Sequence, residues 1–210
     1  RVLTLSQTAW LKQNVGQGGG LHMGPRLTAR IRLALIAGDI LNCAMYRIRP
    51  YECRPGETDK AIGKCRQHIA HALERRRSLV GALRQCRREL GAIEVDRTQV
   101  KPRVAIIGEF WAMTTECDGN YHLQRFLEQE GAEVDVPSIT AWLLYLVWTS
   151  RYDTRTRMRL TRADDGRRGL QGVHVRSRLL GLWLVERALT AGFHCCAKLM
   201  VGRSAPRMWL

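Results

Sequence analysis

Long apolar runs are missing from this chain. The longest, Ala141–Trp148, is far shorter than the roughly 18 residues that a membrane helix needs. The first residues show no signal-peptide pattern either, so we expect a soluble chain in the cytoplasm, with no membrane partner. With 210 residues and 45% hydrophobic residues, the chain can still bury one good core or two modest ones.

The common catalytic fingerprints are missing too. The sequence has no glycine-rich phosphate loop, no GxGxxG motif and no Ser-His-Asp order. The hydrolase and dinucleotide-binding classes therefore have little support. Without a phosphate loop, the chain is not expected to hydrolyse ATP by itself.

Cysteine is present, but its metal-binding spacing is not. None of the seven cysteines forms a C-x-x-C pair, the spacing that often marks iron-sulfur and zinc ligands. Cys65, His68 and His71 could share part of a helix surface, yet Cys65 also belongs to an apolar stripe. Without a signal peptide, reduced thiols or core packing are expected rather than disulfides. No metal site is assigned.

Charge is strongly one-sided. The formal net charge is +15, and 29 of the 34 basic residues are arginine. Such a surface attracts nucleic acid or phosphorylated ligands such as the ADP moiety of coenzyme A. No zinc finger, helix-turn-helix turn or RNA-binding aromatic motif accompanies the charge, so nucleic acid is the disfavoured partner.

Apolar residues at helical spacing predict three helices in residues 1–99. The first contains Leu27–Met45 and ends before Pro50, the second starts at Thr58, and the third covers Leu79–Ile93. A strand over Val2–Leu5 and the glycine-rich loop Asn14–Gly20 would precede them. We interpret this part as the mostly helical remainder of a first α/β lobe, in a chain that is a fragment.

A strand-helix-strand unit is predicted after the linker Glu94–Pro102. The run 103–107 reads as a strand, Asn120 as the N-cap of a helix with Leu123, Phe126 and Leu127 on its apolar face, and 132–136 as a second strand. Gly131 occupies the place of a left-handed residue after the helix. Such units give parallel strands.

The remainder completes a second domain, residues 100–210. A helix is expected around Leu143–Trp148, a loop or weak helix over 151–169, and another helix over Val173–Leu199. The predicted fold class is α/β. It consists of a Rossmann-like (flavodoxin-like) parallel sheet domain with a helical C-terminal part, preceded by the first lobe.

The loop after the first strand of this domain is the first candidate site. Open α/β sheets bind ligands at the carboxyl ends of their strands. The loop offers a permissive glycine, carboxylates, hydroxyls and an aromatic ring, in Gly108, Glu109, Trp111, Thr114, Thr115, Asp118 and Asn120. Alternatively, the carboxylates cap backbone groups and Trp111 belongs to the core.

A second candidate patch surrounds Pro50. Arg47, Arg49, Tyr51 and Glu52 lie within six residues, and arginine forks suit carboxylate and phosphate partners. An internal ion pair bridging the two predicted domains explains the same residues equally well. The sequence does not decide between them.

Several segments resemble activators of 2-hydroxyacyl-CoA dehydratases and the dehydratase subunits that share their fold. The most specific are GEFWAMTTE (108–116) and RPYE (49–52), within a resemblance over roughly residues 14–190. The resemblance implies an iron-sulfur-dependent electron-transfer system acting on an acyl-CoA. A [4Fe-4S]-type cluster would belong to the full-length protein or a partner, and the ATPase domain of activators is missing from this sequence.

Two functions remain open at this point. The chain could be an accessory or reductase-like component of such a hydro-lyase system, binding an acyl-CoA, a cluster or the dehydratase subunits. It could instead be a non-catalytic scaffold lobe that adds an assembly surface to a larger polypeptide. The missing cysteine motifs favour the scaffold when the chain is considered alone.

Overall fold

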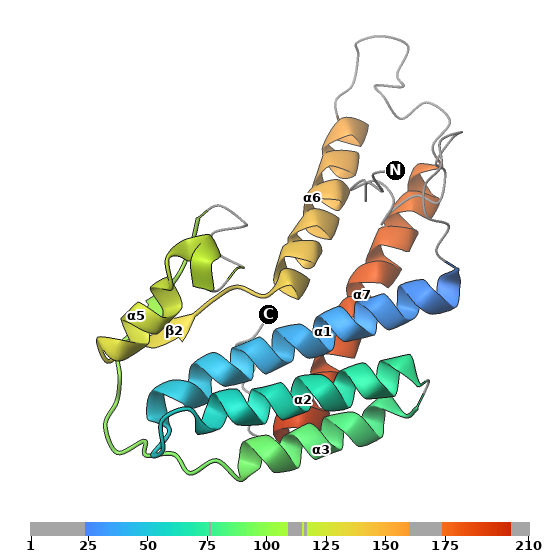
Figure 1. Ribbon diagram of the computed structural model, residues 1–210. Helices are drawn as coiled ribbons and strands as arrows, with labels where there is room; N and C mark the ends of the chain where they lie inside the picture. Colours follow the sequence, from blue (N-terminus) through green and yellow to red (C-terminus); the bar gives the residue numbers. More distant parts are fainter. Residues whose placement is uncertain (1–23, 76, 109–114, 116, 160–173, 203–210) are drawn as a thin grey trace. The chain divides into compact units, whose positions relative to one another are not determined.

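A computed structural model describes residues 24–75, 77–108, 115, 117–159 and 174–202 (Figure 1). By its contacts the chain divides into two compact units, residues 1–32 and 33–210, with the boundary inside the first helix. The interactions discussed below all lie within the second unit. The predicted domain boundary at residues 99–100 stays a prediction. The helices that the structure describes are each too short or too polar to cross a bilayer.

The main core lies among α1 (Pro25–Ile48), α2 (Glu57–Glu74), α3 (Leu79–Gly91) and α7 (Val175–Val201). Each contributes one apolar stripe, as expected for helices that bury a single face. The largest fully buried side chains of this core are Ile40, Leu41, Ile62, Leu83 and Met200. The three helices predicted before residue 94 and the helix predicted over 173–199 are therefore confirmed.

A carboxylate explains the sharp turn between α1 and α2. Pro50 lies in a short 3-10 helix, η2 (Arg49–Tyr51), that ends α1. The Glu52 carboxylate then accepts the backbone N–H groups of Gly56 at 2.6 Å and Thr58 at 2.7 Å. These donors at the start of α2 would otherwise lack partners, so Glu52 performs the task of a capping side chain.

The predicted strand-helix-strand unit is present and parallel. Strand β1 (Arg103–Ala105) pairs with β2 (Glu133–Asp135), and Val104 lies opposite Val134. Helix α5 (Leu123–Gln129) connects them and packs on β2 (Figure 1). Gly131 has φ +90°, the left-handed conformation expected of a residue after a helix.

Two expectations for this unit need correction, and the predicted fold class holds only in its coarse form. Asn120 is not the N-cap of α5, because it ends a 3-10 helix, η3 (Cys117–Asn120), and His122 precedes α5 with φ +57°. The expected apolar face of α5 is not a buried one, since Phe126 is 54% exposed. The sheet has only two strands in the described part of the chain, so the fold is mainly helical and α/β in this coarse sense alone. The strand and glycine-rich loop predicted before residue 21 lie outside the described residues.

Helix α6 (Ile139–Arg159) is longer than the sequence suggested. Residues 151–159 were expected to be a loop or weak helix because arginines dominate them, yet they continue the helix. Arg157 pairs with Asp153 four residues earlier at 3.0 Å, and Arg151 pairs with Glu186 of α7. Thr154 is 1% exposed and its hydroxyl donates to the Ser150 carbonyl. The arginines thus support the helix through ion pairs.

A buried carboxylate joins α1 to the start of α6. Asp39 of α1 accepts the backbone N–H groups of Ile139 at 3.1 Å and Thr140 at 2.7 Å, and also the Thr140 hydroxyl. Burial raises the pKa of Asp39, and the bonds from Thr140 and Ile139 oppose that rise. One side chain from residue 39 therefore fixes where α6 begins, about 100 residues later.

We predict that Asp39→Ala lowers the free energy of unfolding by about 3 kcal/mol, because it leaves several buried donors without an acceptor. Urea unfolding followed by circular dichroism measures this change. Asp96→Ala is the matched control, because Asp96 is exposed and its carboxylate bonds to Thr98 within the same turn, so this variant should leave the free energy of unfolding nearly unchanged. Equal effects of the two variants would contradict the role given to Asp39.

Candidate functional site

A pocket of about 230 Å³ opens at the carboxyl ends of both strands. Its walls come from α1, from the ends of β1 and β2, and from the segment that leads from β2 into α6. This is the edge at which parallel α/β units place their ligands. The position follows from the chain path, because β2 must deliver the chain to the capped start of α6.

Each wall supplies a different chemistry. Helix α1 contributes Tyr46 and Arg47, which offer an aromatic ring and a guanidinium. The strands contribute mainly apolar surface, together with the Asp135 carboxylate. The start of α6 contributes the small side chain of Ala141. The pocket is thus mixed in polarity, with the permanent positive charge of Arg47 on one wall and small apolar groups on another.

The N-terminus of α6 is not an open anion site. Asp39 takes two of its N–H groups, and the Ser138 hydroxyl accepts a third from Ala141 at 3.1 Å. Trp142 N–H bonds to the Ser138 carbonyl. The electrostatic attraction of the pocket for an anion therefore comes from side chains such as Arg47, and not from the helix end.

Cys43 lines the pocket as a neutral thiol. Burial and the nearby Asp39 carboxylate raise its pKa to about 12, although Arg47 acts in the opposite direction. A thiol with such a pKa carries almost no thiolate at neutral pH and is a poor nucleophile. Cys43 therefore contributes a small, polarizable side chain to the pocket lining.

The size of the pocket limits what it can hold. Its volume is below the roughly 300–1,000 Å³ of sites for drug-sized ligands, so it fits a small group or one end of a larger ligand. Among the described side chains, no three from His, Cys, Asp and Glu converge as a metal site needs. Of the Cys65, His68 and His71 trio, Cys65 is fully buried in the core while His71 is exposed.

The first predicted site is described only in part. Gly108 has φ +147°, a conformation that favours glycine, and it is exposed. The Thr115 carbonyl accepts the Asn120 amide at 2.6 Å and the Gln124 amide at 3.2 Å. Asn120 also donates to Gln124, so these groups organise the loop itself. Glu109, Trp111, Thr114 and the side chain of Asp118 lie outside the described residues, and this site stays a prediction.

Gly119 explains how this loop folds so tightly. A Cβ added at this position would overlap the Thr115 side chain. The close approach of the two residues lets Asn120 and Gln124 reach the Thr115 carbonyl. Only glycine provides that space, which gives the Gly119-Asn120 pair a structural meaning other than helix capping.

In the second predicted patch, Arg49 forms an internal ion pair, which was one of the two alternatives that the sequence allowed. Its buried guanidinium donates to Glu128 of α5 through Nε at 2.6 Å and Nη2 at 3.0 Å, and to Asp59 of α2 at 3.3 Å. Arg125 of α5 also binds Asp59, at 2.8 Å. The cluster links the helical part of the chain to the strand-helix-strand unit.

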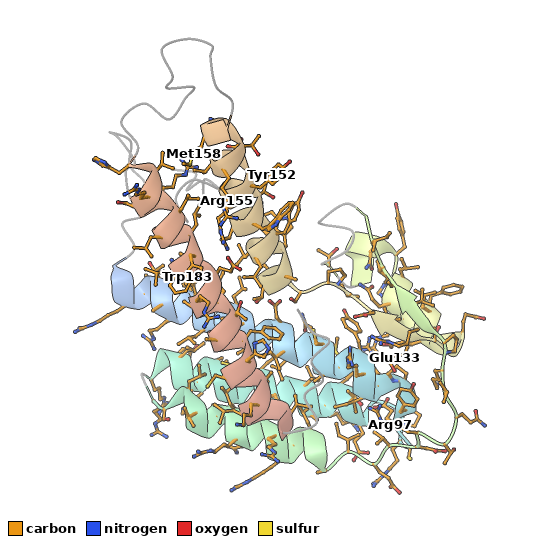
Figure 2. The ribbon with its side chains drawn as sticks, turned by 180° about the vertical axis from the view of Figure 1, so that it is seen from behind. Arg97, Glu133, Tyr152, Arg155, Met158 and Trp183 are labelled. Carbon is orange, nitrogen blue, oxygen red and sulfur yellow. The ribbon has the colours of Figure 1, made fainter. Side chains whose placement is uncertain are left out.

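The other members of the patch have different partners and do not form one site. Tyr51 donates its hydroxyl to Glu133 of β2 at 3.0 Å, and the Arg97 guanidinium lies over the Tyr51 ring, 4.7 Å from the ring centre. Figure 2 labels Arg97 and Glu133. Burial and the bond to Glu133 raise the pKa of Tyr51. Glu52 caps α2, as described above. Only Arg47 of the patch lines the pocket.

Sequence reasoning missed most of the pocket. Cys43, Tyr46, Asp135 and Ser138 were not candidates, although a usable signal existed. Ligands of open α/β sheets bind at the carboxyl ends of the strands, and this principle indicates the segment Asp135-Val-Pro-Ser138 at the end of the second strand as well as the loop after the first. The α1 wall carries no comparable signal, because its residues come close to the strands only through the fold.

Comparisons of the chain with protein families, with curated proteins and with solved structures found no match.

We predict that Arg49→Met costs about 3–5 kcal/mol of stability, because it leaves Glu128, whose side chain is 7% exposed, buried without its cation. The double variant Arg49→Met/Glu128→Gln should be more stable than Arg49→Met alone. Urea unfolding of both variants measures this coupling.

Arg54→Met is the control for that experiment. The Arg54 side chain is 71% exposed beside Glu57 and Glu94, so the loss should stay below about 1 kcal/mol. If Glu128→Gln gives no recovery in the Arg49→Met background, the buried-pair interpretation is wrong.

Stability should also depend on the ionisation of Asp59. Burial acts to raise its pKa, but the Arg125 hydrogen bond and the charges of Arg125 and Arg49 prevail and lower it. A lowered folded-state pKa stabilises the protein above the ordinary value near 3.8, and this contribution is lost as the pH falls through the folded pKa. We therefore predict that Asp59→Asn is destabilising at neutral pH and that its deficit shrinks below about pH 4. Urea unfolding from pH 7 to pH 3 tests this, and a deficit independent of pH would contradict it.

Proposed function

We propose that the chain is an accessory lobe of a 2-hydroxyacyl-CoA dehydratase-type system, and that its pocket at the strand ends receives the acyl end of an acyl-CoA. The observation that carries this proposal is the position of the pocket at the carboxyl ends of two parallel strands. In this proposal β1, α5 and β2 are part of a Rossmann-like sheet that the rest of a larger polypeptide, or a dehydratase subunit, completes.

The size and polarity of the pocket support an acyl group as its occupant. A short acyl chain needs apolar walls, which Val134, Val136 and Ala141 supply. A 2-hydroxyl and a thioester oxygen need polar partners at the same depth, and Asp135 and Arg47 are within the lining. A volume of about 230 Å³ leaves the nucleotide part of coenzyme A outside.

A cation beside the pocket supports binding of that nucleotide part. Arg97 donates to the backbone carbonyl of Arg47 at 2.9 Å, and Arg47 lines the pocket. Phosphate groups of coenzyme A are attracted by these guanidinium groups, and the net charge of +15 adds a general attraction. Lys101 precedes β1 and lies toward the other end of the strands.

The proposal assigns the iron-sulfur cluster to the full-length protein or a partner. A [4Fe-4S] cluster needs several converging thiolates. The pocket supplies one cysteine, Cys43, which stays protonated at neutral pH. Cys65, Cys86 and Cys196 are buried in the helical core instead. The role proposed for this lobe is therefore to bind and orient the ligand.

A second candidate function, a scaffold lobe, is supported by exposed apolar surface. Tyr145, Trp148 and Tyr152 form a stacked row along α6, and each is more than 55% exposed. Met158 of α6 and Trp183 of α7 are exposed as well, and Figure 2 labels both together with Tyr152. Such patches are typical of surfaces that contact another protein. Partner docking is compatible with both functions.

Calorimetric titration of the whole chain with lactyl-CoA, a short 2-hydroxyacyl-CoA, distinguishes the two functions. We predict that lactyl-CoA binds at least tenfold more tightly than free coenzyme A, because only the thioester fills the pocket. Ala141→Leu, which places a larger side chain in the pocket, should remove that difference.

The matched control is Ala188→Leu, the same substitution at an exposed position of α7, which should bind as the wild type does. Equal affinity for lactyl-CoA and coenzyme A, or no effect of Ala141→Leu, would contradict the acyl pocket and leave the scaffold function. Binding of arbitrary single-stranded DNA that weakens steeply with salt would instead favour a basic nucleic-acid-binding module.

A further inference from the structure

Two cysteines face each other where α2 packs against α3. Cys65 of α2 and Cys86 of α3 both have 0% of their surface exposed. The Cys65 Sγ lies 3.8 Å from the Cys86 carbonyl oxygen, and the Cys86 Sγ lies 3.7 Å from the Cys65 carbonyl oxygen. This reciprocal arrangement requires each thiol to reach the backbone of the other helix.

The side chains of the two cysteines also influence each other's ionisation. A hydrogen bond between them raises the pKa of Cys65, and the same bond lowers the pKa of Cys86. Because each sulfur reaches the backbone carbonyl of the other residue, the two side chains share one gap between the helices. A disulfide joins sulfurs about 2.05 Å apart with Cβ atoms about 3.8 Å apart, so closing the bond requires the two side chains to rotate toward each other.

We propose that Cys65 and Cys86 form a redox-active dithiol that closes to a disulfide between α2 and α3 when the protein meets a low-molecular-weight disulfide such as oxidised glutathione. The thiols are reduced in the structure. This site is independent of the acyl pocket, because neither α2 nor α3 lines that pocket.

The exchange proceeds in two steps that balance. The Cys86 thiolate attacks one sulfur of oxidised glutathione, which forms a mixed disulfide and releases one glutathione thiolate. Cys65 then loses its proton and attacks the Cys86 sulfur, which forms the Cys65–Cys86 bond and releases the second glutathione. The protein loses two electrons and two protons, and glutathione gains them.

Burial of the two thiols makes their oxidation slow. Oxidised glutathione cannot reach a thiol with no exposed surface, so exchange requires local separation of α2 from α3. Cys53, which is exposed, should react first and without such an opening. Once formed, the buried disulfide is protected from reductants by the same packing.

The site can be identified by mass because cleavage after glutamate separates the two cysteines. Residues 58–74 contain Cys65 as their only cysteine, and residues 75–89 contain only Cys86. The whole chain is incubated with a glutathione redox buffer in two arms, once native and once refolded from urea. The free thiols are then alkylated, and the chain is digested. We expect peptides 58–74 and 75–89 joined, with a mass two hydrogens below their sum, as the dominant crosslink in the refolded arm and a slower product in the native arm.

Thermal unfolding provides the second readout. The oxidised wild type should unfold roughly 5–10 °C above the reduced protein, because the bond closes a loop of about 20 residues. Cys86→Ala should lose both the crosslink and the shift, whereas Cys53→Ala should keep both. A crosslink that is absent from both arms, or no more abundant than pairs with Cys43 or Cys196, overturns the proposal. A crosslink without a rise in the unfolding temperature overturns it as well.

Discussion

The buried guanidinium of Arg49 is the interaction on which the rest of the arrangement depends. It follows the last residue of α1, binds Asp59 of α2, and holds Glu128 of α5 through two nitrogens. A charge with 4% of its side chain exposed is costly unless it is paired, so the three elements must meet at this point. The ion pair thereby fixes the two-stranded unit against the helices, which its own six strand residues could hardly achieve.

The pocket is a consequence of two such long-range polar contacts. Arg49 holds α5 and β2 near the end of α1, while Asp39 holds the start of α6 against the middle of α1. The chain between these points, from Val134 to Ala141, must cross the surface of α1 and leaves a gap against Cys43 and Arg47. The proposed acyl site therefore owes its shape to residues that do not contact the ligand.

Local signals in the sequence were sufficient for the elements but not for their contacts. Apolar spacing located α1, α2, α3 and α7, and the order of strand, helix and strand located β1, α5 and β2 with the correct parallel pairing. The length of α6 was missed because its arginines are stabilised by Asp153 and by Glu186 of another helix. The contact of Asp39 with Thr140 spans 101 residues, and no local pattern marks it. Arg49 was recognised as important, yet only the fold shows that its partners are internal.

If the Arg49 ion pairs fix the strand-helix-strand unit to the helices, both should open as one cooperative body. Hydrogen exchange with mass spectrometry tests this claim most directly, by comparing the cross-strand amides of Ile106 and Glu133 with amides in the middle of α2. We predict that the two groups of amides open with free energies equal to within about 1 kcal/mol, and that both lose protection in Arg49→Met. Strand amides that exchange far more readily than those of α2, and that ignore Arg49→Met, would contradict it.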